Sequence, residues 1–103
     1  MDAADAVGKA SLGGRAPYVT IYLKAQDAIV TRAMFQTFGC GISIACCSML
    51  TEMIGGSSVA DCGTLTGESL IEALSGIPAD KQFCAHLAVE ALRDALSHLP
   101  PVD

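Results

Sequence analysis

The 103-residue chain contains no tryptophan, and aromatic residues make up only 5% of it. A hydrophobic core must therefore be built mainly from aliphatic and small side chains, which is feasible because 51% of the residues are apolar. That apolar content argues against intrinsic disorder, and the length suits a single domain. The sequence has no run of 18 apolar residues, so we expect no transmembrane helix.

Positive charge is also scarce. Six lysines and arginines stand against eleven acidic residues, which gives a formal net charge of −5. This balance argues against general attraction to nucleic acid or to an anionic membrane. The first residues are acidic and lack the basic-then-apolar order of a secretory signal peptide. We therefore expect a cytoplasmic protein with no nucleic-acid and no membrane partner.

The five cysteines include no CxxC pair, which excludes the usual zinc-ribbon and thioredoxin motifs. They are Cys40, Cys46, Cys47, Cys62 and Cys84. An odd number of cysteines in a reducing compartment argues against a disulfide framework. If a metal binds, its ligands must come from separate elements that folding brings together.

The period of the hydrophobic pattern changes once along the chain. Residues 1–16 are rich in glycine and alanine and predict a flexible lead-in to one domain over residues 17–99. Residues 18–25 and 29–38 read as two strands of an antiparallel hairpin, the second long enough to divide in two.

From Gly41 onward, apolar residues recur at helical spacing, and the first helix is expected to bury Ile42, Cys46, Met49, Leu50 and Met53. Ser57-Ser58 and Thr66 are expected to start the next two helices, and Pro78 the last one. We predict an α+β fold, in which a small antiparallel sheet of two or three strands precedes three or four helices packed on one of its faces.

Cys40 and Cys84 are the candidate functional residues. Cys40 lies between two glycines where the second strand ends and a helix begins, and glycines leave a neighbouring sulfur uncovered. Cys84 lies close to the start of the last helix. Free N–H groups and the positive helix end favour the thiolate at both places. Two such thiolates could form half of a cysteine-rich metal site, whereas the alternative is that both are buried structural thiols.

The other candidate ligands are predicted to be structural. Cys46 lies on the apolar side of its helix, and Cys47 flanks it, so both are expected to pack in the core. Cys62 falls in a polar segment and is expected to be exposed. His86 shares helical spacing with charged residues, which predicts a solvent-exposed position rather than a metal ligand.

Two segments carry a resemblance to a known family. Residues 35–48 read Phe-Gln-Thr-Phe-Gly-Cys-Gly-Ile-Ser-Ile-Ala-Cys-Cys-Ser, and residues 76–84 read Gly-Ile-Pro-Ala-Asp-Lys-Gln-Phe-Cys. They resemble the iron–sulfur cluster assembly scaffold family of the NifU/IscU N-terminal type. There, an F-x-T-x-G-C-G-x-x-I-A-S-S-S segment carries the central ligand cysteine, and an L-P-P-x-K-x-H-C segment ends in the last one. The resemblance implies that Cys40 and Cys84 bind iron or an Fe–S cluster, with zinc as another possible metal.

The departures from this family pattern concern its ligands. The family's first ligand cysteine, in a C-G-D segment, is replaced by Arg15, and a guanidinium cannot ligate metal. The histidine before the last cysteine is replaced by Phe83. A [2Fe–2S] cluster takes four protein ligands, whereas only two of the family's cysteines are present here. A homodimer, a partner or a small thiol could supply the others, and the alternative is that no metal binds.

The resemblance also implies partners, namely a cysteine desulfurase and the chaperone or acceptor proteins of cluster transfer. We expect a scaffold rather than an enzyme.

Two other functions stay open. The chain could be a metal-free module that docks on an assembly component, or a carrier in which Cys40 holds a persulfide, which requires one reactive thiolate.

Overall fold

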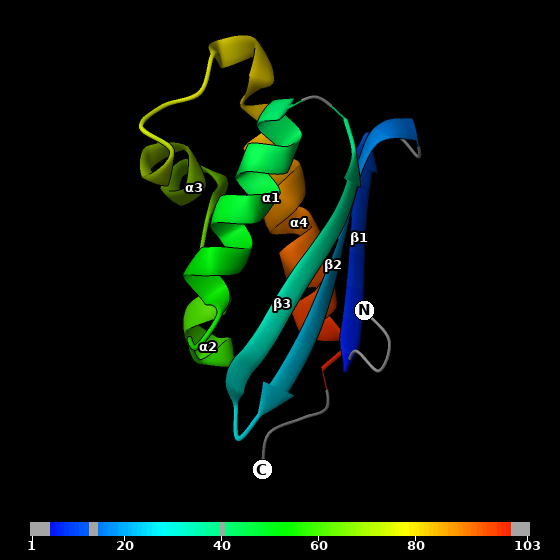
Figure 1. Ribbon diagram of the computed structural model, residues 1–103, viewed down its shortest axis with the longest axis vertical. Helices are drawn as coiled ribbons and strands as arrows, with labels where there is room; N and C mark the ends of the chain where they lie inside the picture. The colour runs from blue at the N-terminus through cyan, green and yellow to red at the C-terminus, as the bar shows by residue number, and fades with distance from the viewer. Residues whose placement is uncertain (1–4, 13–14, 40, 100–103) are drawn as a thin grey trace.

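The computed structural model describes residues 5–12, 15–39 and 41–99. These residues form three strands, four α-helices and one short 3-10 helix. In chain order they are β1 (Ala6–Leu12), β2 (Arg15–Gln26), β3 (Ile29–Phe38), α1 (Gly41–Ile54), α2 (Val59–Cys62), α3 (Gly67–Ala73), η1 (Ala79–Lys81) and α4 (Phe83–Ser97). The predicted α+β fold, with strands first and helices after them, is confirmed (Figure 1).

The sheet is antiparallel throughout and has the order β1-β2-β3. Its central strand alternates as predicted, with Val19, Ile21 and Leu23 buried in the core. The predicted hairpin joins β2 to β3 through Asp27 and Ala28, both of which have positive φ. Positive φ at two central residues matches the right-handed twist of a hairpin. The second predicted strand is not divided, because β3 pairs with β2 from Ile29 to Phe38, with one register shift that leaves Thr31 without a Cα partner in β2.

Residues 6–12 correct the prediction of a flexible lead-in over residues 1–16, because they form β1 and pair with β2. The small residues in this segment serve close packing rather than flexibility. A Cβ atom added at Gly8 would overlap the carbonyl oxygen of Ala91 and the backbone of Ala95 in α4. Glycine at position 8 therefore lets a helix lie directly against the strand.

The helices cover one face of the sheet. α4 contacts β1 and β2, and α1 contacts both β3 and α4 (Figure 1). Ser58 and Thr66 cap α2 and α3 through their side chains, as their sequence positions predict. The last helix begins slightly later than expected, since residues 79–81 form η1 and α4 starts at Phe83. None of the helices within the described ranges is both long and apolar enough to cross a membrane.

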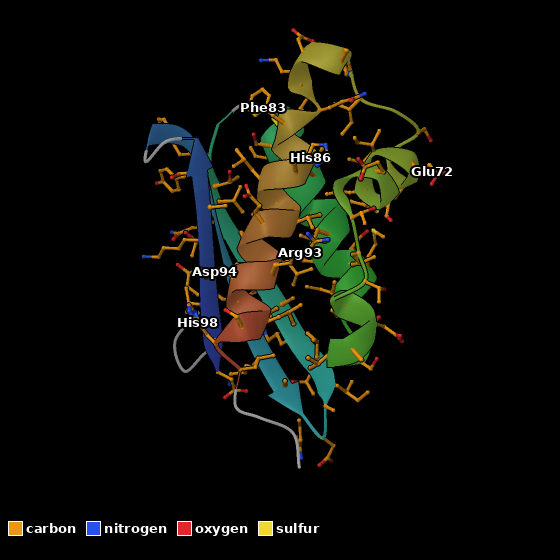
Figure 2. The ribbon with its side chains drawn as sticks, turned by 180° about the vertical axis from the view of Figure 1, so that it is seen from behind. Glu72, Phe83, His86, Arg93, Asp94 and His98 are labelled. Atoms are coloured by element: carbon orange, nitrogen blue, oxygen red, sulfur yellow. The ribbon has the colours of Figure 1, made fainter. Side chains whose placement is uncertain are left out.

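Side chains of α4 and of its C-cap residue bond to the outer edge of β1. The backbone N–H of Lys9 donates to a carboxylate oxygen of Asp94 at 2.9 Å. The ring Nδ1–H of His98 donates to the carbonyl oxygen of Val7 at 2.8 Å. Figure 2 shows Asp94 and His98 on the side of α4 that faces β1. Polar backbone groups at this edge are thus bonded within the chain.

The close approach at Gly8 predicts a large cost for added volume. Gly8→Ala should lower the free energy of unfolding by about 1–3 kcal/mol, because the new methyl group meets helix backbone that cannot move independently. Urea denaturation measures the change. Gly63→Ala is the control, since Gly63 has an ordinary φ of −69° and its surroundings accept a Cβ atom. Equal stability of the two variants would contradict close packing at Gly8.

Candidate functional site

The segments that carry both candidate cysteines converge at one end of the molecule. β3 ends and α1 and α4 begin at this end, where the first residues of β2 also lie (Figure 1). Cys40 lies outside the described residues, but its neighbours agree with the prediction, because β3 ends at Phe38 and α1 begins at Gly41. Arg15, which replaces the family's first ligand, is the first residue of β2. Three segments distant in sequence therefore meet near the candidate site.

Cys84 is the second residue of α4 and is only 1% exposed. The hydroxyl of Ser43 donates a hydrogen bond to its sulfur at 3.3 Å. Ser43 is the third residue of α1, and it lies one helical turn after Cys40. This contact joins the first turn of α4 to the first turn of α1. It places the Cys84 sulfur beside the helix that follows Cys40.

Cys46 and Cys47 are core residues, as predicted, and neither is exposed. Burial, with smaller contributions from the nearby Cys46 and Cys84, raises the pKa of Cys47 to about 12. A thiol with this pKa stays protonated at neutral pH, and it is the thiolate that binds metal or attacks an electrophile. Cys47 is therefore suited to packing between α1 and α4.

The prediction that Cys62 is exposed is wrong. Cys62 ends α2 and is only 2% exposed, and its thiol donates weakly to the carbonyl oxygen of Ile54 at 3.9 Å. Burial raises its pKa, with a further contribution from the charge of Asp61. The short helix turns residue 62 inward although the surrounding sequence is polar. The thiol lies near the end of α1, far from Cys84 at the start of α4.

His86 is exposed, as predicted, and its ring packs against Gly67 at the start of α3. Figure 2 shows His86 on the side of α4 toward α3. Phe83, which stands where the family has a histidine, packs partly buried against the core. Neither residue adds a ligand beside Cys84.

The described residues contribute one thiol to the candidate site, that of Cys84. Within the described ranges, which omit Cys40, no three His, Cys, Asp or Glu residues are grouped so as to hold a metal ion. The donor chemistry suits a soft metal, because thiolates select zinc and Fe–S clusters. The sulfur already accepts a hydrogen bond, as metal-binding thiolates in proteins commonly do. This donor set fits part of a cluster site rather than a complete one.

Sequence reasoning missed Ser43. We expected Ile42, Cys46, Met49, Leu50 and Met53 to form the buried side of α1, whereas the buried residues are Ser43, Cys46, Cys47, Leu50 and Ile54. The available signal was a polar residue at a position one turn before Cys47, on the face that α4 covers. A buried hydroxyl needs a partner, and the partner here is a sulfur atom.

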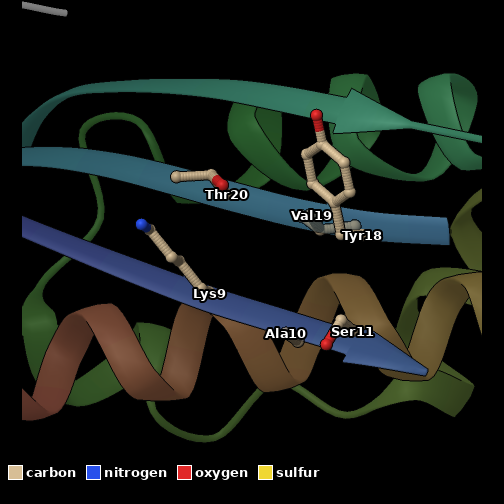
Figure 3. A pocket seen from close by; sticks show the side chains of 6 residues that line it. All are labelled: Lys9, Ala10, Ser11, Tyr18, Val19 and Thr20. Carbon is tan, nitrogen blue, oxygen red and sulfur yellow. The ribbon is translucent and has the colours of Figure 1, made fainter. Parts of the chain in front are cut away.

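The opposite face of the sheet carries no helix and has a shallow hollow of about 350 Å³. Lys9 and Ser11 of β1 and Tyr18 and Thr20 of β2 line it, together with two neighbours (Figure 3). The ring of Tyr18 stacks on that of Phe38, with centroids 5.9 Å apart. No described cysteine or histidine lines this hollow.

A family model described as the NifU-like N terminal domain matches residues 2–101. The chain belongs to this family. The family assignment confirms the resemblance that the segments around Cys40 and Cys84 indicated. It also accounts for the fold, since a solved NifU-like protein (N-terminal) from Brucella abortus matches 96% of this chain and 81% of its own, with a TM-score of 0.77 at 16% identity.

Two curated relatives of this NifU-like domain are named as iron–sulfur cluster assembly scaffold proteins. The protein from Archaeoglobus fulgidus is 40% identical over 93 residues, which cover 90% of this chain and 61% of the relative. The protein from Aquifex aeolicus is 37% identical over 83 residues, which cover 81% of this chain and 53% of the relative. The NifU-like domain therefore matches only about half to three fifths of the length of these relatives.

The raised pKa of Cys47 makes stability depend on alkaline pH. The protonated thiol favours the folded state fully below the reference value of 9.0, and this contribution is lost as pH rises from 9.0 toward 12. Cys47→Ala should therefore lessen the fall in the free energy of unfolding across that range. The effect is at most about 1.4 kcal/mol per pH unit for one proton. Urea denaturation at each pH measures the free energy of unfolding of both proteins. An equal fall in the two proteins across this range would contradict the prediction.

Proposed function

We propose that this NifU-like domain is a scaffold for iron–sulfur cluster assembly that holds iron or a nascent cluster through Cys40 and Cys84. The observation that carries the proposal is the hydrogen bond between Ser43 and Cys84, because it ties together the two helix starts that carry these cysteines. The names of the relatives support the same function. The cluster is cargo in this role, and the domain performs no catalysis of its own.

The number of thiolates indicates how the cluster is held. One chain offers two of the family's cysteines, whereas a [2Fe–2S] cluster takes four protein ligands. Two chains that meet at their cysteine ends supply four thiolates around one cluster. We therefore propose a homodimer in the loaded state, with one cluster shared between two copies of Cys40 and Cys84.

Partners follow from the same role. A cysteine desulfurase would supply sulfur at the cysteine end, and a chaperone or acceptor protein would take the finished cluster. Residues 77–81 correspond to the L-P-P-x-K part of the family segment, which the resemblance implies is the chaperone-recognition stretch. This stretch is accessible, since Pro78, Ala79 and Asp80 are exposed. Its proline and its lysine, Lys81, are the two positions that match the family pattern.

Anaerobic reconstitution with iron and sulfide tests the scaffold function. The wild-type protein should bind about one iron and one acid-labile sulfide per chain and elute as a dimer, as one shared [2Fe–2S] cluster requires. Cys40→Ser and Cys84→Ser should each abolish the bound cluster. Cys62→Ala is the matched control, because it removes a buried thiol near the other end of α1.

A colourless, iron-free wild-type protein after reconstitution would overturn the scaffold function. The second candidate, a persulfide carrier, is favoured by the same short ligand set, because it needs one accessible thiolate and no metal. It predicts that incubation with a cysteine desulfurase and cysteine adds one sulfur atom to Cys40. Mass spectrometry of the peptide that contains Cys40 distinguishes the two functions.

Restoring a cysteine at position 15 should strengthen metal binding. Arg15→Cys adds a thiolate at the start of β2, at the same end of the molecule as α1 and α4. Iron bound after reconstitution should increase and should resist a chelator longer than in the wild-type protein. Arg15→Ala removes the positive charge without adding a ligand, so it separates the effect of losing the charge from the effect of gaining a thiolate. Equal iron binding in Arg15→Cys and Arg15→Ala would contradict a vacant ligand position at residue 15.

A further inference from the structure

The geometry points to Ser43 as a positioning residue that holds the Cys84 sulfur for cluster binding. This role rests on the scaffold function proposed above and adds a residue that the family pattern around Cys40 does not assign. Ser43 touches the sulfur rather than the cargo. Its effect on cargo must therefore act through Cys84.

The position of Ser43 is unusual for a polar residue. It is 2% exposed and shares the buried side of α1 with Cys46, Cys47, Leu50 and Ile54. Among the described residues, Thr20 is the one other polar side chain classed as buried, at 7% exposure. Burial of a hydroxyl is unfavourable unless a good hydrogen bond compensates it. Alanine would fill this position of a packed helix without that requirement.

The partner of the hydroxyl explains why a serine is useful here. The Ser43 hydroxyl donates to the Cys84 sulfur at 3.3 Å. A neutral thiol sulfur is a weak acceptor, whereas an ionised acceptor forms a shorter and stronger bond. A cysteine that ligates metal is in the thiolate form. The hydroxyl is therefore placed to donate to the Cys84 sulfur when that sulfur is a metal ligand.

The hydrogen bond also sets geometry. Ser43 lies in the first turn of α1, three residues after Cys40, and Cys84 lies in the first turn of α4. The bond fixes the Cys84 sulfur relative to the turn that follows Cys40. Residues that orient a metal ligand commonly change metal affinity by about 10- to 100-fold when they are replaced.

The role of Ser43 predicts that Ser43→Ala does not lower the stability of the metal-free protein but does lower its affinity for metal. In the metal-free protein, Ser43→Ala should leave the midpoint of urea denaturation equal to or above the wild-type value. In the same variant, cobalt(II) affinity, read from the thiolate-to-cobalt charge-transfer band, should fall by about 10-fold or more. A residue that served the fold alone would lose stability and leave the band unchanged.

Three further variants complete the experiment. Ser43→Thr keeps the hydroxyl and should restore most of the cobalt affinity. Ser48→Ala makes the same substitution at an exposed position of α1 and should match the wild-type protein. Cys84→Ser gives the charge-transfer absorbance that remains when the Cys84 sulfur is absent. In the reconstituted protein, Ser43→Ala should also shift the reduction potential of the cluster to a more negative value, because a hydrogen bond to a ligand sulfur is lost.

The outcomes separate the role of Ser43 from the scaffold function. Wild-type affinity and potential in Ser43→Ala, with Cys84→Ser defective, would overturn the role of Ser43 and leave the scaffold intact. A loss of metal-free stability in Ser43→Ala without a loss of cobalt affinity would overturn it as well. A wild-type protein that binds cobalt and cluster no better than Cys84→Ser would overturn both proposals.

Discussion

The packing of α4 against β1 is the constraint on which the position of the candidate site depends. Because Gly8 has no side chain, the backbone of α4 at Ala91 and Ala95 rests directly on the strand. That contact fixes the second half of a 15-residue helix whose second residue is Cys84. The first turn of α4 then reaches α1, where Ser43 meets the sulfur. A small residue at one end of the chain thus helps to place a candidate ligand near the other end.

Three of the described thiols lie in two kinds of environment. Cys47 and Cys62 lie where burial raises the pKa, so their sulfur atoms behave as compact apolar groups. Cys84 is equally buried but has a hydroxyl donor at the start of a helix, where negative charge is stabilised. Burial alone therefore does not distinguish the candidate ligand Cys84 from Cys47 and Cys62. Cys84 differs from them in its hydroxyl donor and in its place in the first turn of a long helix.

Much of the fold could be predicted from the sequence because the patterns were local. The alternation around Ile21, the caps at Ser58 and Thr66, and the helix start after Gly39 each depend on neighbours within a few residues. β1 was missed because its small residues favour a strand only when α4 packs against them. That packing joins residues more than 80 positions apart in the sequence. The burial of Cys62 was missed because its surrounding sequence is polar, whereas the short helix α2 turns this residue inward. For the site, the family motifs identified Cys40 and Cys84 as candidate ligands, whereas Ser43 could be recognised only once its sulfur partner was known.

The bonds from α4 to the β1 edge restrict how two chains can come together. A sheet grows when an incoming strand bonds to free N–H and C=O groups at its edge. At Val7 and Lys9 these groups already bond to His98 and Asp94, and at the other edge Val30 bonds to the backbone of Ser57 and Gly56. Joining two sheets into one across β1 would first break bonds within each chain. Two copies that shared cargo would therefore meet more easily through helix starts and loops than through a continuous sheet, and each sheet would keep its order of three strands.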